Sequence, residues 1–123
     1  MRLHLPHMLA LFVTSLLAVP AMTHAECTYP KAPDSVPDGK SASEAEMVAA
    51  MQAFKQFNSD VTAYLACVDS EADDQIKGAG GSSSTITLIK SMQTKKHNSA
   101  VDELQALAGK FNEQVRIFKS SHK

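Results

Sequence analysis

The chain has 123 residues, and its 12 lysines and arginines nearly balance its 13 aspartates and glutamates, which gives a formal net charge of −1 at pH 7. Because nucleic-acid-binding domains carry a clustered excess of lysine and arginine, this balance argues against nucleic acid as a partner. The length predicts one domain with a modest hydrophobic core.

Residues 1–25, MRLHLPHMLALFVTSLLAVPAMTHA, have the pattern of a secretory signal peptide. A short region with Arg2 precedes an apolar run over residues 8–19, and Thr23 and Ala25 lie three and one positions before the expected cut. The apolar run is shorter than the roughly 20 residues of a membrane-spanning helix. Cleavage after Ala25 is therefore favoured over an uncleaved anchor. We expect a periplasmic or secreted protein with no membrane span after cleavage.

Cys27 and Cys67 are the two cysteines of the chain, and an even number in a small exported protein predicts a disulfide. Closing a loop of about 40 residues stabilises the folded state by roughly 4 kcal/mol in the chain-entropy description. A redox-active pair is the alternative, but catalytic cysteines usually lie close together in sequence. We expect a structural bond.

Residues 26–43 form the next segment, and its stretch CTYPKAPDSVPDGK contains three prolines. Proline favours an extended, polyproline-like backbone and excludes a helix here. The letters PDG predict a turn before the first helix. Ser43 and Glu46 have the spacing of a capping box, and Ser41 with Glu44 offers a second register.

A first amphipathic helix is predicted over residues 44–76, because apolar residues recur at alternating spacings of four and three. The stripe consists of Met47, Met51, Phe54, Asn58, Val61, Leu65 and Val68. Ala50, Phe57 and Tyr64 widen the stripe on one side. Met47, Met51 and Met92 raise the possibility of a soft copper site, but methionines on an apolar stripe are more typical of a core.

A second helix is predicted over residues 84–120, after the flexible turn KGAGGSSS, with a serine at 83 or 84 as its cap. The run TITLI could form a strand instead, but a lone strand has no partner. The helical stripe consists of His97, Val101, Leu104, Ala108, Phe111, Val115 and Phe118. Leu88, Ile89 and Met92 extend it along a drifting line. Gly109 costs about 1 kcal/mol relative to alanine, so we expect either close approach of another backbone or a kink there.

These elements predict an all-α fold, an antiparallel two-helix hairpin covered by the extended segment 26–43. Cys67 lies about 35 Å along the first helix at 1.5 Å per residue. The residues from Cys27 to Ser43 can span about 50 Å when extended, so a disulfide can pin the far end of the segment. A bare hairpin of this size buries too little apolar surface, and the cover and the disulfide compensate for that.

The stretches CTYPKAPDSVPDGKSASEAEM, YLACV and HNSAVDELQALAGKFNEQVRIFK resemble small, uncharacterised exported (periplasmic) proteins of proteobacteria. Those proteins have an N-terminal Cys-Pro segment followed by a helical hairpin. The resemblance covers most of the chain after residue 25. It implies the fold and the compartment, and it brings no activity, cofactor or partner with it.

Four carboxylates near the end of the first helix could bind a cation: Asp69, Glu71, Asp73 and Asp74. The spacing fails the calcium-loop pattern, which requires glycine at the sixth position and glutamate at the twelfth. Negative charge is unfavourable at a helix C-terminus, and basic side chains of the second helix can offset it. These are Lys90, Lys95, Lys96 and His97. We expect a solvated acidic face rather than a metal site.

Asn58 occupies an apolar-stripe position, where a buried polar side chain needs a partner. His97 or Asn98 could supply one, and such a polar layer in the core would fix the register of the helices. His97 and Asp102 do not share a helix face closely, and no oxyanion-hole sequence accompanies them. We therefore predict no catalytic residue.

We expect a non-enzymatic interaction module of the bacterial envelope that binds another protein through its helix faces. Phe57, Tyr64 and Phe118 are the expected partner face. One alternative is a structural homodimer in which two hairpins form a four-helix bundle. The other is a weak metal or small-ligand binder. No cofactor is expected, and the partner is an envelope protein or a second copy of the chain.

The signal-peptide prediction has a direct test. When the full chain is expressed in an export-competent bacterium, we expect the purified protein to begin at Glu26 and to comprise the 98 residues 26–123. Intact-mass spectrometry measures this to the residue. A mass that includes residues 1–25 would show an uncleaved anchor instead.

Overall fold

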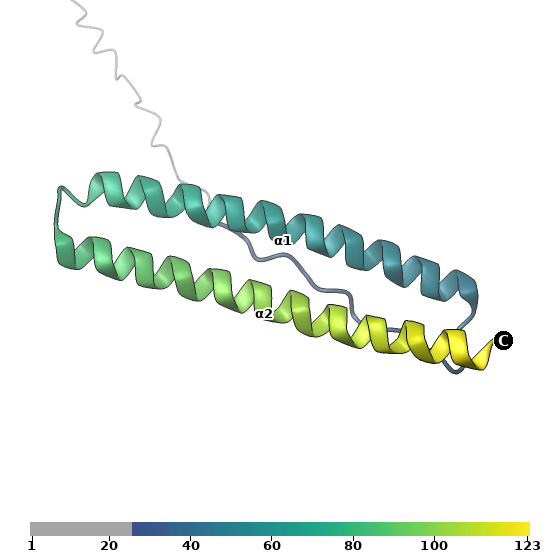
Figure 1. The fold of residues 1–123 in the computed structure, drawn as a ribbon. Coiled ribbons are helices and arrows are strands. Elements are labelled where there is room, and N and C mark those ends of the chain that lie inside the picture. The colour runs from purple at the N-terminus through teal and green to yellow at the C-terminus, as the bar shows by residue number, and fades with distance from the viewer. Residues whose placement is uncertain (1–25) are drawn as a thin grey trace, which may run out of the picture.

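The computed structural model describes residues 26–123, in which two long antiparallel helices lie side by side (Figure 1). Helix α1 spans Glu44–Gly78 and helix α2 spans Ser83–Ser121. Residues 26–123 contain no strand, and the TITLI run lies within α2. The predicted helical hairpin is therefore confirmed. The predicted signal peptide, residues 1–25, lies outside the described residues.

The start of α1 is fixed by the capping box that its sequence predicts. Ser43 Oγ accepts a hydrogen bond from the Glu46 backbone N–H at 3.2 Å, and Glu46 Oε2 accepts one from the Ser43 backbone N–H at 2.7 Å. The register is thus Ser43 with Glu46, and not Ser41 with Glu44. Hydrogen bonds from the Ser43 backbone and hydroxyl lower the pKa of the Glu46 carboxyl.

The turn between the helices depends on two glycines. Gly80 and Gly81 have φ of 59° and 81°, the left-handed region that glycine adopts without steric cost. The N-cap of α2 is Ser82, so a cap at residue 83 or 84 is wrong. Ser82 Oγ lies 3.0 Å from Thr85 Oγ1 rather than bonding to a helix N–H. The turn is complete at Gly81, so the N-cap of α2 lies one residue before the first of the two predicted positions.

The extended segment 26–43 is a third packing element. Figure 1 shows it lying along the hairpin between α1 and α2. It contributes Val36 to one core cluster and Ala32 to another. The first cluster is built on Ala42, Met47 and Phe111, and the second is built on Phe57, Val61 and Ala100. Each cluster joins both helices and the segment, and beyond the clusters the buried Val68 and Ala72 of α1 continue the core toward the interhelical turn.

The buried face of α1 is rotated relative to the predicted stripe. Phe57 is 2% exposed, whereas the neighbouring Asn58 is exposed and Met51 is 41% exposed. Adjacent helical residues point about 100° apart, so only one of the two can face inward. Because α1 packs against α2 and the extended segment together, its buried face keeps Met47, Val61 and Val68 of the predicted stripe and adds Phe57 from the line beside it.

The extended segment is fastened near both of its ends. Cys27 and Cys67 form the predicted disulfide, with their Cα atoms 5.8 Å apart. At the other end, the Gly39 backbone N–H donates to Gln114 Oε1 at 2.8 Å. A Cβ atom on Gly39 would collide with the backbone carbonyl oxygen of Gln114 and lie 2.8 Å from the Phe118 nitrogen. The segment therefore touches the backbone of α2 at a position that only glycine fits.

Gly109 has no such role. A Cβ atom there would meet nothing within 4 Å, and the residue is exposed. Close approach of another backbone is thus wrong for Gly109, and α2 continues through it without interruption. The position of close approach in this fold is Gly39, in the PDG turn.

The two glycines give a matched pair of substitutions. We expect Gly39→Ala to destabilise the protein by about 1–3 kcal/mol, because the new methyl group overpacks a backbone contact. We expect Gly109→Ala to stabilise it by about 0.5–1 kcal/mol, because alanine loses less backbone entropy in a helix. Urea unfolding of the oxidised proteins, followed by circular dichroism, measures both changes. Equal stability of Gly39→Ala and wild type would show that the turn does not dock on α2.

Candidate functional site

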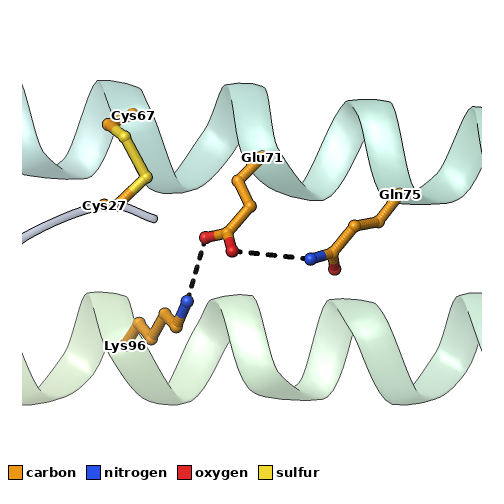
Figure 2. The surroundings of a disulfide bond; sticks show 5 residues. All are labelled: Cys27, Cys67, Glu71, Gln75 and Lys96. Atoms are coloured by element: carbon orange, nitrogen blue, oxygen red, sulfur yellow. Dashed lines mark hydrogen bonds and ion pairs between the residues drawn. A yellow bond between two sulfur atoms is a disulfide. The ribbon is translucent and has the colours of Figure 1, made fainter. Parts of the chain in front are cut away.

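The extended segment covers only part of the hairpin. It meets α1 at Cys27, opposite Cys67, and runs from there toward the start of α1 (Figures 1 and 2). From Val68 to the interhelical turn, the two helices continue without this cover. The disulfide therefore marks the boundary between the filled and the open part of the groove between the helices.

The open groove has a volume of about 220 Å³. Its apolar lining comes from both helices and consists of Val68, Ala72, Ile89 and Met92. The polar residues around it are Glu26, Glu71, Gln75, Gln93 and Lys96. An apolar floor within a polar rim is typical of a surface that contacts another molecule.

Exposed apolar side chains of α2 extend this groove onto the surface. Leu88 is 60% exposed and Met92 is 55% exposed. They are four residues apart and therefore neighbours on one face of the helix. Met92 also lines the groove. The apolar strip and the groove form one continuous surface at the turn end of the hairpin.

An ion pair crosses the groove beside the disulfide. Figure 2 shows Lys96 of α2 reaching Glu71 of α1, with 2.9 Å between Nζ and Oε2. Gln75 Nε2 also donates to Glu71, at 3.5 Å. The hydrogen bond to Glu71 raises the pKa of Lys96. The pair is partly shielded from water and ties the two helices together where the extended segment begins.

Asp69 makes a second polar link between the helices. Its Oδ1 accepts a hydrogen bond from Gln93 Nε2 at 2.8 Å and lies 2.7 Å from His97 Nε2. These contacts, with Gln93 first, lower the pKa of Asp69. The partner of His97 is therefore Asp69 rather than Asn58. Because the pKa of Asp69 is lowered, the stability from these contacts is present above its ordinary pKa and is lost on acidification.

The predicted polar core layer is wrong. Asn58 and Asn98 are both exposed, and His97 lies at the half-buried edge of the interface. The reason is the rotation of α1, which turns Phe57 inward and Asn58 outward. Asn58 instead accepts a hydrogen bond at its backbone oxygen from Thr62 Oγ1, at 2.9 Å.

The acidic cluster is largely used in ion pairs and hydrogen bonds. Asp69 and Glu71 bond to α2, as described above, and Asp74 pairs with Lys77 at 3.2 Å. Of the four predicted basic neighbours, Lys96 and His97 make these contacts. Lys90 and Lys95 are exposed. Over residues 26–123, no group of three or more His, Cys, Asp or Glu side chains could hold a metal ion.

The methionines that the sequence placed in the core behave differently from one another. Met47 is 6% exposed and belongs to the core, as predicted. Met51 and Met92 are exposed, so the core prediction is wrong for them. The two exposed methionines have different surroundings, because Met92 lines the open groove and Met51 is absent from its lining.

The predicted partner face does not form a surface patch. Phe57 lies in the core, since it fills the space between α2 and the extended segment. Tyr64 is half-buried against Tyr29, with ring centroids 5.0 Å apart, and Phe118 packs on the cluster around Phe111. Sequence reasoning missed Leu88 and Met92 as surface residues. Their drifting apolar line, which departs from the main stripe of α2, was the available signal.

Tyr29 connects the extended segment to both helices. Its ring packs edge-on against Tyr64 of α1, and its hydroxyl donates to Glu103 Oε2 of α2 at 2.6 Å. Burial, followed by the hydrogen bond and negative charge of Glu103, raises the pKa of Tyr29 to about 12. Together with the disulfide, this contact holds the start of the segment in the groove.

We found no match for this chain among protein-family models, curated proteins or solved structures. The fold and the groove nevertheless define a class of protein. It is a helical hairpin with a disulfide-fastened extended segment, whose interhelical groove is filled by that segment on one side of the disulfide and open on the other.

The contact between Tyr29 and Glu103 predicts an unusual titration. In the variant Tyr64→Phe, which leaves Tyr29 as the single tyrosine, we expect tyrosinate absorbance to rise with a midpoint of about pH 12, compared with an ordinary value of 10.0. Because the folded-state pKa is raised, the stability from this contact is complete below about pH 10 and is lost as the pH rises through about 12.

Circular dichroism recorded during the same titration shows whether the helices are still folded. The matched variant Glu103→Gln keeps an acceptor but removes the charge, and we expect it to lower the midpoint. A midpoint at the ordinary value in the Tyr64→Phe protein would show that the Tyr29 hydroxyl is in free contact with water.

Proposed function

We propose that this protein is a non-enzymatic interaction module of the bacterial envelope, which binds another protein through its helix faces at the open groove. The observation that carries the proposal is the groove between the helices, which meets the exposed apolar side chains of Leu88 and Met92 at its edge. Contiguous exposed apolar surface with a polar rim is characteristic of protein interaction sites.

The size of the groove favours a protein partner over a small ligand. Sites for small molecules and cofactors usually have volumes of about 300–1,000 Å³ and bury most of the ligand. The groove here has about 220 Å³ and opens onto the surface strip of α2. It can receive a few side chains of a partner whose remaining surface rests on Leu88.

The polar groups of the groove favour binding over catalysis. Glu71 and Lys96 pair with each other across the groove, and Gln93 donates to Asp69 of the opposite helix. Such pairs hold the two helices at a fixed distance and leave the floor shaped for contact. A general base must be free to reach the proton that it abstracts, and the carboxylate of Glu71 is already engaged with Lys96. This arrangement therefore suits a binding module.

Export to the envelope is supported by the disulfide, since such bonds persist in oxidising compartments such as the bacterial periplasm. The resemblance to exported hairpin proteins of proteobacteria supports the same compartment. Over residues 26–123, no helix is long and apolar enough to cross a membrane.

The proposal is tested by comparing two Met→Glu variants in capture from envelope extract. Met92 and Met51 are both exposed methionines on helices, but only Met92 lines the groove. We expect the tagged wild type and Met51→Glu to recover the same partner. We expect Met92→Glu to lower recovery about tenfold or more, because a charge replaces an apolar contact of the interface centre. Quantitative mass spectrometry measures the recovery.

Equal recovery of every bound protein by wild type and Met92→Glu would contradict the proposal. Recovery of the protein itself alone, with twice the monomer mass in light scattering, would indicate the homodimer. All three proteins must show the same melting temperature, so that a difference in capture reports on the groove and not on folding.

A further inference from the structure

The open groove continues a groove that the chain already fills with an extended segment of its own. On the filled side of Cys27, the segment lies between the helices and contributes Ala32 and Val36 to the two core clusters. On the other side of Cys27, the same two helices line the open groove. The intramolecular interface therefore shows how this helix pair holds an extended chain.

Besides the disulfide and the contacts of Tyr29, two kinds of contact hold the chain's own segment. Small and branched apolar side chains enter the space between the helices, as Ala32 and Val36 do. A helix glutamine bonds to the backbone at the turn that ends the segment, since Gln114 Oε1 accepts the Gly39 N–H at 2.8 Å. A glutamine side chain suits this task because its carbonyl oxygen accepts a backbone N–H while its amide nitrogen can donate to another group.

The open groove presents the same two kinds of group. Its floor has apolar side chains of both helices, Val68 and Ala72 from α1 and Ile89 and Met92 from α2. One glutamine lies at each side, Gln75 on α1 and Gln93 on α2. Figure 2 shows Gln75 projecting from α1 toward α2, beyond the ion pair that marks the end of the filled part.

We propose that the open groove binds an extended peptide segment of a partner protein, placed end to end with the chain's own residues 26–39. One or two aliphatic side chains of the peptide occupy the floor. The side-chain oxygens of Gln75 and Gln93, whose amide nitrogens donate to Glu71 and Asp69, accept from its backbone N–H groups. This inference rests on the proposed function and specifies the form of the partner at the same site.

The dimensions of the groove favour an extended chain over a helix. Its volume of about 220 Å³ is somewhat larger than the roughly 150 Å³ cavity that holds a benzene molecule. It therefore accepts one or two side chains. An α-helix is about 10–12 Å wide with its side chains, so a partner helix would rest on the rim at Leu88 and Met92. The chain's own segment enters between the helices because it is extended.

The test uses a phage-displayed library of short linear peptides as the probe. The library is selected on the oxidised, exported protein, and peptides that also bind Met92→Glu are removed. The strongest peptide is synthesised with a fluorescent label, and its Kd is measured by fluorescence anisotropy. We expect the affinity to fall about tenfold or more in Met92→Glu and to be unchanged in Met51→Glu.

Two further comparisons separate an extended peptide from a helical one. We expect proline substitutions in the middle of the peptide to be tolerated at alternate positions, because proline fits an extended backbone but breaks a helix. We expect Gln75→Ala to weaken binding several-fold, because a hydrogen bond to the peptide backbone is lost. Gln52→Ala, at an exposed glutamine of α1 outside the groove, is the matched control.

Each remaining outcome overturns the inference. If proline abolished binding at every central position, the partner would be a helix. If the selection gave no peptide whose binding depends on Met92, a linear segment would be excluded. In either case, Met92-dependent capture of an envelope protein would leave the proposed function standing. A dimer in light scattering that Met92→Glu dissociates would place a second copy in the groove and contradict both proposals.

Discussion

The packing of residues 26–39 between the two helices is the interaction on which the rest of the structure depends. A pair of helices has one shared contact face and cannot enclose side chains from all sides. Here the third layer is an extended chain, and both core clusters draw a residue from it. The segment makes few hydrogen bonds to the helices, so its position depends on the disulfide, on the contacts of Tyr29 and on the fit of Gly39.

Much of the fold could be predicted because its signals are local. Proline placement, the Ser43–Glu46 capping box, the glycine-rich turn and the spacing of apolar residues each depend on a few neighbouring residues. The disulfide followed from there being two cysteines in a chain whose first residues have the pattern of a signal peptide. These signals agree with one another, which is the condition under which a sequence specifies one structure.

The candidate site could not be predicted in the same way, because it depends on how three elements share one interface. Whether Phe57 or Asn58 points into the core depends on where α2 and the extended segment lie relative to α1. Similarly, nothing in the sequence around Gly39 or Gly109 says which of them meets another backbone. The open groove is defined by where the segment stops, and that is a property of the assembled fold.

The position of Cys67 along α1 also determines a length in this fold. Because the disulfide fixes where the extended segment begins, the position of this cysteine along α1 sets how much of the groove between the helices is filled by the segment and how much is left open. Each helical turn by which such a cysteine moved would change the open length by about 5.4 Å, or between one and two residues of an extended chain. The length of the open groove is thus set by a single residue position, separately from the residues that line it.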